Sequence, residues 1–183
     1  DAWRRLTRPA ALALAASILL LAGIGGYVFY NTNILNEYRT RDQRIATLVQ
    51  YERRYKQFEK LPQPTIARVD LRVELHPEQR TADITGTYLL ENRTAKPIDS
   101  VHVTIDKSVE ARTLTFDRPA TRVRQDEAVG YHILRLAKPL QPRETARMRF
   151  GVRSAPRGFS NDKPTGEVVA NGTHFQRKWM PIL

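Results

Sequence analysis

The chain has 183 residues, of which 41% are hydrophobic and 27% are charged, and its mean hydropathy is −0.49. This length suffices for one ordinary domain with an additional element, and this composition excludes both a multi-span membrane protein and a disordered chain. Cysteine is absent, which excludes disulfide scaffolds, thiolate zinc sites, iron–sulfur clusters and cysteine nucleophiles. The net charge of +11 arises from 30 basic and 19 acidic residues that are spread along the chain rather than gathered in one basic block.

Residues 9–30 form an uncharged run of 22 residues. A helix of that length spans about 33 Å, which is enough to cross a hydrocarbon layer of about 30 Å. Residues 1–8 are a basic flank that we expect on the cytoplasmic side. The side chains that we expect to anchor the span at the two membrane surfaces are Trp3, Arg4, Arg5, Arg8, Tyr27 and Tyr30.

A cleaved signal peptide is the competing interpretation of the same run. Its basic start fits, but an apolar stretch of 22 residues is longer than the usual 7–15, and no cleavage site with small residues follows Tyr30. The sequence therefore favours a retained anchor over a signal that is removed.

Residues 31–61 follow the span and predict an amphipathic stalk helix. Apolar residues recur at helical spacing between residues 34 and 60, with charged residues between them. Leu61 precedes Pro62, a position that disfavours helical backbone and ends the pattern. We expect the stalk to lie against the following domain, because amphipathic helices usually pack on their own protein. Its apolar stripe comprises Ile34, Leu35, Tyr38, Ile45, Leu48, Tyr51, Tyr55 and Phe58.

Residues 62–155 change to a period of two, which is typical of strands with one buried face. At least six short strands joined by turns, with no helical pattern between them, predict a mainly β antiparallel sandwich or saddle-shaped sheet. Residues 156–183 contain prolines, glycines and polar residues, and we expect them to form a loop that leads to a further, missing domain. The predicted strands lie around residues 69–75, 84–90, 101–105, 114–116, 131–136 and 146–152.

The residue types and their spacing provide no catalytic, cofactor-binding or metal site. The histidines are His76, His102, His132 and His174, and none has a second histidine or a glutamate at the spacing of a zinc site on a helix. We expect them at the surface or at strand ends. Basic residues alternate with acidic ones and no aromatic stacking set accompanies them, so nucleic acid is not an expected partner.

Short runs of familiar sequence lie at residues 30–38, 51–56 before 61–64, 69–78, 75–90, 171–175 and 181–183. These runs resemble large bacterial proteins that fuse an ABC-transporter-like permease to an M1-family aminopeptidase. The resemblance covers most of residues 27–183, although His174 replaces an aromatic residue of the family pattern. It implies that the chain is the last transmembrane helix, the stalk and the non-catalytic saddle domain of such a protein, and that zinc binds only in the missing catalytic domain.

The expected function is therefore that of a membrane anchor and β-saddle segment that helps to shape a peptide-binding cleft. Expected partners are the lipid bilayer, other transmembrane helices and the catalytic domain of the parent protein, and peptides. The expected location is the inner membrane, with the N-terminus in the cytoplasm and the β domain in the periplasm. The alternative is a single-pass membrane protein whose extracytoplasmic β-sandwich binds a protein partner.

Overall fold

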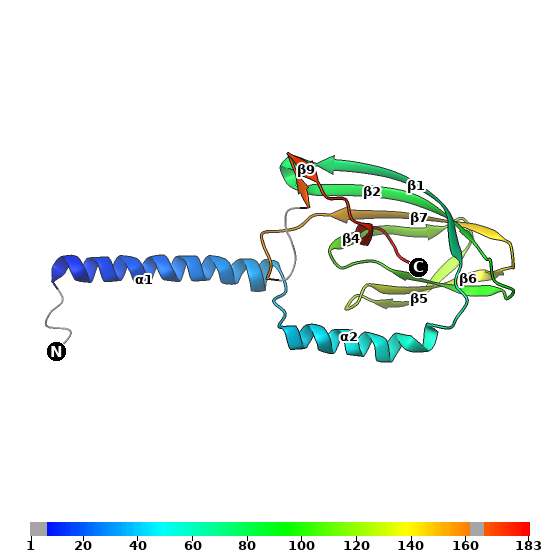
Figure 1. Ribbon diagram of the computed structural model, residues 1–183, viewed down its shortest axis with the longest axis horizontal. Coiled ribbons are helices and arrows are strands. Elements are labelled where there is room, and N and C mark those ends of the chain that lie inside the picture. Colours follow the sequence, from blue (N-terminus) through cyan, green and yellow to red (C-terminus); the bar gives the residue numbers. More distant parts are fainter. Residues whose placement is uncertain (1–6, 162–166) are drawn as a thin grey trace. The chain divides into compact units, whose positions relative to one another are not determined.

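The computed structural model describes residues 7–161 and 167–183. These residues form two units, one made of residues 7–40 with 157–161 and the other of residues 41–156 with 167–183. Figure 1 shows a long helix in the first unit, and a second helix and a β-sandwich in the other. The chain is mainly β with antiparallel sheets, as the sequence predicts.

The first unit is built on α1 (Arg8–Phe29), which continues into a π-helix, η2 (Tyr30–Leu35). Pro9 lies in the first turn, where a missing N–H leaves no hydrogen bond unmade. At the other end, the side chains of Asn31 and Thr32 donate hydrogen bonds to the carbonyl oxygens of Tyr27 and Val28, each at 2.9 Å. Polar side chains thus bond to backbone oxygens where the apolar helix ends.

Residues 157–161 lie beside this helix end. Asn36 Nδ2 donates to the carbonyl oxygens of Arg157 and Phe159 at 2.9 and 3.1 Å. Gly158 has a φ of +53°, and a Cβ atom there would lie 2.1 Å from Asn31 Oδ1. Only glycine fits this close approach without displacing the asparagine.

The second unit begins with α2 (Arg41–Tyr55) and a 3₁₀ turn, η3 (Lys56–Phe58). The helix is shorter than the predicted stalk, because residues 36–40 are not helical and separate it from η2. Ile45 and Leu48 of the predicted apolar stripe remain 48% and 65% exposed. Tyr55 is buried and Tyr51 is half-buried, so the C-terminal half of α2 makes the contact with the sandwich that the sequence predicts for the stalk.

Two antiparallel sheets form the sandwich (Figure 1), one with the strand order β1-β2-β7-β4 and the other with the order β3-β6-β5. A short hairpin of β8 and β9 is separate from both. The core contains Ile84, Leu90, Val103, Met148 and Phe150 among its most buried side chains. The strands are β1 (Thr65–His76), β2 (Thr81–Glu91), β3 (Ile98–Thr104), β4 (Val109–Phe116), β5 (Ala120–Asp126), β6 (Tyr131–Leu140), β7 (Thr145–Ser154), β8 (Val168–Val169) and β9 (Gly172–Thr173).

Strand β5 does not appear among the predicted strands. Its seven residues are all exposed or only partly buried, and Arg122 and Arg124 lie near its middle. An alternating apolar pattern arises only when one face of a strand is buried, so this edge strand left no such pattern in the sequence.

Residues 167–183 belong to the β domain, so the prediction of a loop over residues 156–183 is wrong for this part of the chain. Trp179 is fully buried in the core, and its Nε1 donates a hydrogen bond to Glu167 Oε2 at 2.8 Å. Ile182 exchanges two backbone hydrogen bonds with Thr104 of β3, at 2.7 and 2.8 Å. A single buried tryptophan has no periodicity, and the sequence pattern therefore missed this segment.

Candidate functional site

Helix α1 is the candidate membrane anchor, because none of its 22 residues is buried. Its leucines at positions 12, 19 and 21 are 72–73% exposed. The helix with its extension, Arg8–Leu35, is long and apolar enough to cross a membrane by its length and composition. Keeping the apolar surface of α1 in water would be unfavourable by about 25 cal/mol for each Å² of that surface.

Three of the six predicted anchoring residues lie in the described part of the chain. Arg8 is the first residue of α1, while Tyr27 and Tyr30 lie near its other end. The structure therefore places Arg8 and this pair of tyrosines at opposite ends of one helix. The Tyr27 ring packs at 5.8 Å from the ring of Phe159, a contact that the sequence did not predict. Trp3, Arg4 and Arg5 lie outside the described residues.

A second candidate site is an aromatic groove between α2, η3 and the sheet of β3, β6 and β5. The groove has a volume of about 500 Å³. The rings of Tyr55 and Tyr131 contact each other at a tilt of 40° with centroids 4.2 Å apart, and Phe58 contacts His102 edge-on at 5.1 Å. The lining residues are Tyr51, Glu52, Tyr55, Lys56, Phe58, Glu59, Gln63, His102, Thr104, Tyr131, Ile182 and Leu183.

His102 and Tyr131 hold the only hydrogen-bonded ring pair that the described residues place in this groove. Nδ1 of His102 lies 2.6 Å from the Tyr131 hydroxyl oxygen. Burial lowers the pKa of His102, and burial beside Tyr51 raises the pKa of Tyr131 to about 12. Both groups are therefore neutral at pH 7.

The groove offers no strong nucleophile. Ser100 Oγ lies 3.4 Å from His102 Nε2, but it donates its hydrogen bond to Asp99 Oδ1 at 3.0 Å. A serine whose proton points away from the histidine is not activated for attack. The aromatic contacts in the groove pack α2 and η3 on the sheet.

One histidine differs from its predicted place. His102 and His132 are both buried, with 8% and 6% exposure. His132 is the second residue of β6 and lies at a strand end as expected, whereas His102 lies within β3. His102 lies under η3, and His132 lies on the inner side of the sheet, opposite Val103 of β3. Over residues 7–161 and 167–183, no three His, Asp or Glu side chains lie close enough together to hold a metal ion.

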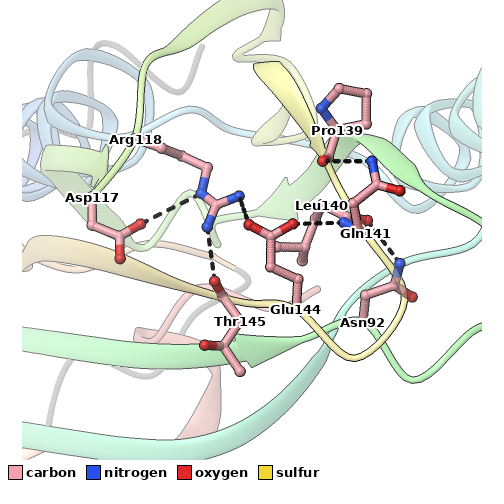
Figure 2. Close-up of polar contacts among 8 residues, drawn as sticks. All are labelled: Asn92, Asp117, Arg118, Pro139, Leu140, Gln141, Glu144 and Thr145. Carbon is pink, nitrogen blue, oxygen red and sulfur yellow. Dashed lines mark hydrogen bonds and ion pairs between the residues drawn. The ribbon is translucent and has the colours of Figure 1, made fainter.

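The polar cluster in Figure 2 braces the turn between β6 and β7. Glu144 accepts hydrogen bonds from Arg118 at 2.9 Å and from the backbone N–H of Gln141 at 2.8 Å. The Gln141 N–H and then the Arg118 guanidinium lower the pKa of Glu144. Asn92 is fully buried, and its amide donates to the carbonyl oxygens of Leu140 and Lys96, each at 2.8 Å. These contacts hold the turn between β6 and β7.

Comparisons with known proteins found structural similarity alone. No protein-family model and no curated protein matches the sequence. The structure is similar to that of the M1 zinc metallopeptidase from Deinococcus radiodurans, and to a mutant of that enzyme bound to a Tyr-Ser-Ala substrate. Each has 16% sequence identity and a TM-score of 0.41, and the match covers 52% of this chain and 21% of the other. The structural neighbours are thus M1 zinc metallopeptidases at low identity, and the match spans about a fifth of their length.

Proposed function

We propose that this chain is a non-catalytic membrane anchor and β-saddle segment of an M1-like membrane protein. In this proposal α1 crosses the membrane with Arg8 on the cytoplasmic side, and the β domain lies outside the cytoplasm. There it would help to shape a peptide-binding cleft, while zinc and the catalytic residues would belong to a further domain of the parent protein.

The observation that carries the proposal is that no residue of the apolar helix α1 is buried. A helix of 22 residues with no buried residue needs an apolar environment, and a helix is the one structure that satisfies its backbone within a single segment in lipid. The short sequence runs that resemble the permease–aminopeptidase fusions are consistent with this order of anchor, stalk and sheet.

The chemistry of the β domain supports a non-catalytic role. In the described part of the domain, burial keeps both buried histidines neutral at pH 7, and no three His, Asp or Glu side chains cluster as metal ligands would. A domain of this kind supplies shape and binding surface rather than reacting groups. The second candidate, a single-pass protein whose sandwich binds a protein partner, is favoured by the exposed apolar row on β1, where Val69, Leu71, Val73 and Leu75 are 37–46% exposed.

Membrane extraction of the full chain tests the anchor. We expect the expressed chain to resist alkaline carbonate and to be released by detergent. The double variant Leu19→Arg and Leu21→Arg places two charges near the middle of α1 and would cost about 5–7 kcal/mol of insertion free energy. The control is Ile45→Arg with Leu48→Arg in α2, where the two apolar side chains are also exposed, at 48% and 65%.

We expect the α1 variant to leave the membrane fraction and the α2 variant to remain in it. A wild-type chain that carbonate releases, or an α1 variant that stays embedded, would refute the anchor. The peptidase parentage has a separate test, because it requires a His-Glu-x-x-His motif downstream in the same reading frame and further spans upstream.

A further inference from the structure

Strand β1 is a long free edge of the four-stranded sheet. It pairs with β2 on one side, and across residues 7–161 and 167–183 no strand or isolated bridge pairs with its other side. All of its residues except Ile66 and His76 are exposed. A long edge strand with unpaired backbone groups is a template for another strand.

The inner face of β1 is apolar but uncovered. Val69, Val73 and Leu75 lie opposite the buried residues Tyr88, Ile84 and Ala82 of β2. Directly opposed residues of an antiparallel pair share a face, so the apolar row of β1 faces the same side as the core. The smaller sheet does not cover this row, which corrects the sequence-based prediction of a half-buried strand.

The outer face of β1 carries charges that alternate in sign. Arg68 pairs with Asp70 at 3.0 Å, and Arg72 pairs with Glu74 at 2.7 Å. Along this face the order is therefore basic, acidic, basic, acidic.

We propose that β1 pairs with β1 of a second copy of this chain, antiparallel and centred on Leu71. In this register Arg68 faces Glu74 of the second copy and Asp70 faces Arg72, so that all four charged residues on each strand meet an opposite charge. On the inner face, Leu71 meets Leu71 and Val69 meets Val73. The two four-stranded sheets then form one continuous sheet.

The charges select this register against its neighbours. A centre at Asp70 would place Arg68 opposite Arg72 and Asp70 opposite itself. A centre at Arg72 would place Asp70 opposite Glu74 and Arg72 opposite itself. Like charges directly opposite each other destabilise a pair of strands. Of these three registers, the one centred on Leu71 places opposite charges across from each other on the outer face and apolar residues across from each other on the inner face.

The other sheet edges are less suited to such pairing. Strand β4 has a register irregularity between Ala111 and Thr113, and β5 has one between Arg122 and Arg124. Strand β3 is bridged by Ile182 at Thr104. In β1 the irregularity lies between Ile66 and Arg68, outside the proposed pairing of residues 68–74.

Cysteine cross-linking of the full chain tests the register directly, because the chain contains no cysteine of its own. Leu71→Cys would face itself across the interface, within the 4.4–6.8 Å between Cα atoms that a disulfide needs. Val69→Cys would lie about 14 Å from its own copy, four residues along the strand, and is too far to react.

On mild oxidation, Leu71→Cys should give a covalent dimer as the main product. Val69→Cys alone should give at least about tenfold less, but two differently tagged chains carrying Val69→Cys and Val73→Cys should cross-link with each other as the proposed register requires. The matched control is Val123→Cys on β5, which has the same 46% exposure as Val69. Fluorescence of the buried Trp179 reports whether each variant is folded.

Charge inversion gives a second test that needs no cysteine at the centre. The variant with Arg68→Glu, Asp70→Arg, Arg72→Glu and Glu74→Arg keeps the alternation and should dimerise with itself. Mixed with the wild-type chain it should form on the order of tenfold fewer heterodimers than homodimers, because every opposed pair then has like charges.

The proposal is overturned if Leu71→Cys cross-links no better than Val123→Cys, or if Val69→Cys alone reacts as well as the mixed pair. It is equally overturned if the product joins β1 to a different protein or to a further domain of the parent. The test applies whether the chain partitions into membranes or into water, so its failure is distinguishable from failure of the anchor.

Discussion

The hydroxyl of Tyr55 donates a hydrogen bond to Oδ2 of Asp126, and this contact joins α2 to the end of β5. Arg54 adds an ion pair to the same carboxylate at 3.3 Å, and Arg124 lies 5.9 Å from the Tyr55 ring centre. The hydrogen bond from Tyr55 is the main reason that the pKa of Asp126 is lowered. Tyr55 thus helps to hold α2 to the sandwich.

Replacement of Tyr55 by phenylalanine should destabilise the β domain by about 1–2 kcal/mol, because a partly buried carboxylate loses its strongest hydrogen bond. The ring contact with Tyr131 would remain. Urea unfolding of the full chain in detergent measures the loss. The control Tyr51→Phe removes a hydroxyl from a neighbouring ring of the same cluster, and an equal loss in both variants would contradict a specific role for the bond to Asp126.

The stability of the β domain should fall as the pH drops below about 6.5. Burial lowers the pKa of both His102 and His132, so the unfolded chain binds protons at a pH where the folded chain does not. The charged neighbours are Asp99 for His102, and Arg122 and Glu127 for His132. The stabilising contribution of the two histidines is present at a pH above their pKa in the unfolded chain. It is lost as the pH falls toward their lower pKa values in the folded chain.

Urea unfolding at pH 7.5, 6.5 and 5.5 measures this dependence. The double variant His102→Gln with His132→Gln should have a flatter profile than the wild-type chain. His174 is exposed, and His174→Gln should leave the slope unchanged. A wild-type profile that rises toward pH 5.5 would disprove the assignment.

Replacement of Trp179 by alanine should destabilise the sandwich by about 3–5 kcal/mol, the usual cost of emptying a large buried site. Phe175 touches the Trp179 ring edge-on at 5.4 Å but is 41% exposed, so Phe175→Ala should cost much less. Thermal unfolding of both variants gives the comparison. Similar small losses would mean that residues 167–183 are not part of the core.

Replacement of Asn92 by aspartate should cost more than about 3 kcal/mol, because a carboxylate oxygen would face the carbonyl oxygens of Leu140 and Lys96 in a buried position. Asn171 is exposed, and Asn171→Asp provides a control with the same chemical change. Calorimetry measures the stability of both variants. An Asn92→Asp variant as stable as the wild-type chain would show that the amide protons of Asn92 do not hold the turn.

The sequence predicts those helices and strands in which burial or contact with lipid repeats regularly along the element, because apolar residues then recur at a regular spacing. The uncharged run that became α1 and the alternation that became β2 and β7 are of this kind. Sequence reasoning missed β5, which is exposed on both faces, and Trp179, whose burial depends on contacts far along the chain. It also assigned a buried face to β1, because alternation shows which residues share a face but not whether another layer covers it.

The aromatic groove had a partial signal in the sequence. Tyr51, Tyr55 and Phe58 recur at helical spacing and were predicted as one stripe, but their meeting with His102 and Tyr131 depends on how the helix packs on the sheet. The polar cluster around Asn92 and Glu144 gave no signal, because it joins loops far apart in the sequence (Figure 2).

Single-cysteine labelling of the full chain in intact spheroplasts tests the proposed placement of the β domain most directly. Thr7 and Lys138 are both exposed, and a membrane-impermeant maleimide reports which of the two cysteine variants faces the outside. We expect Lys138→Cys to be labelled at once, and Thr7→Cys to be labelled only after the membrane is opened. Labelling of Thr7→Cys in intact cells, or protection of Lys138→Cys until lysis, would contradict it.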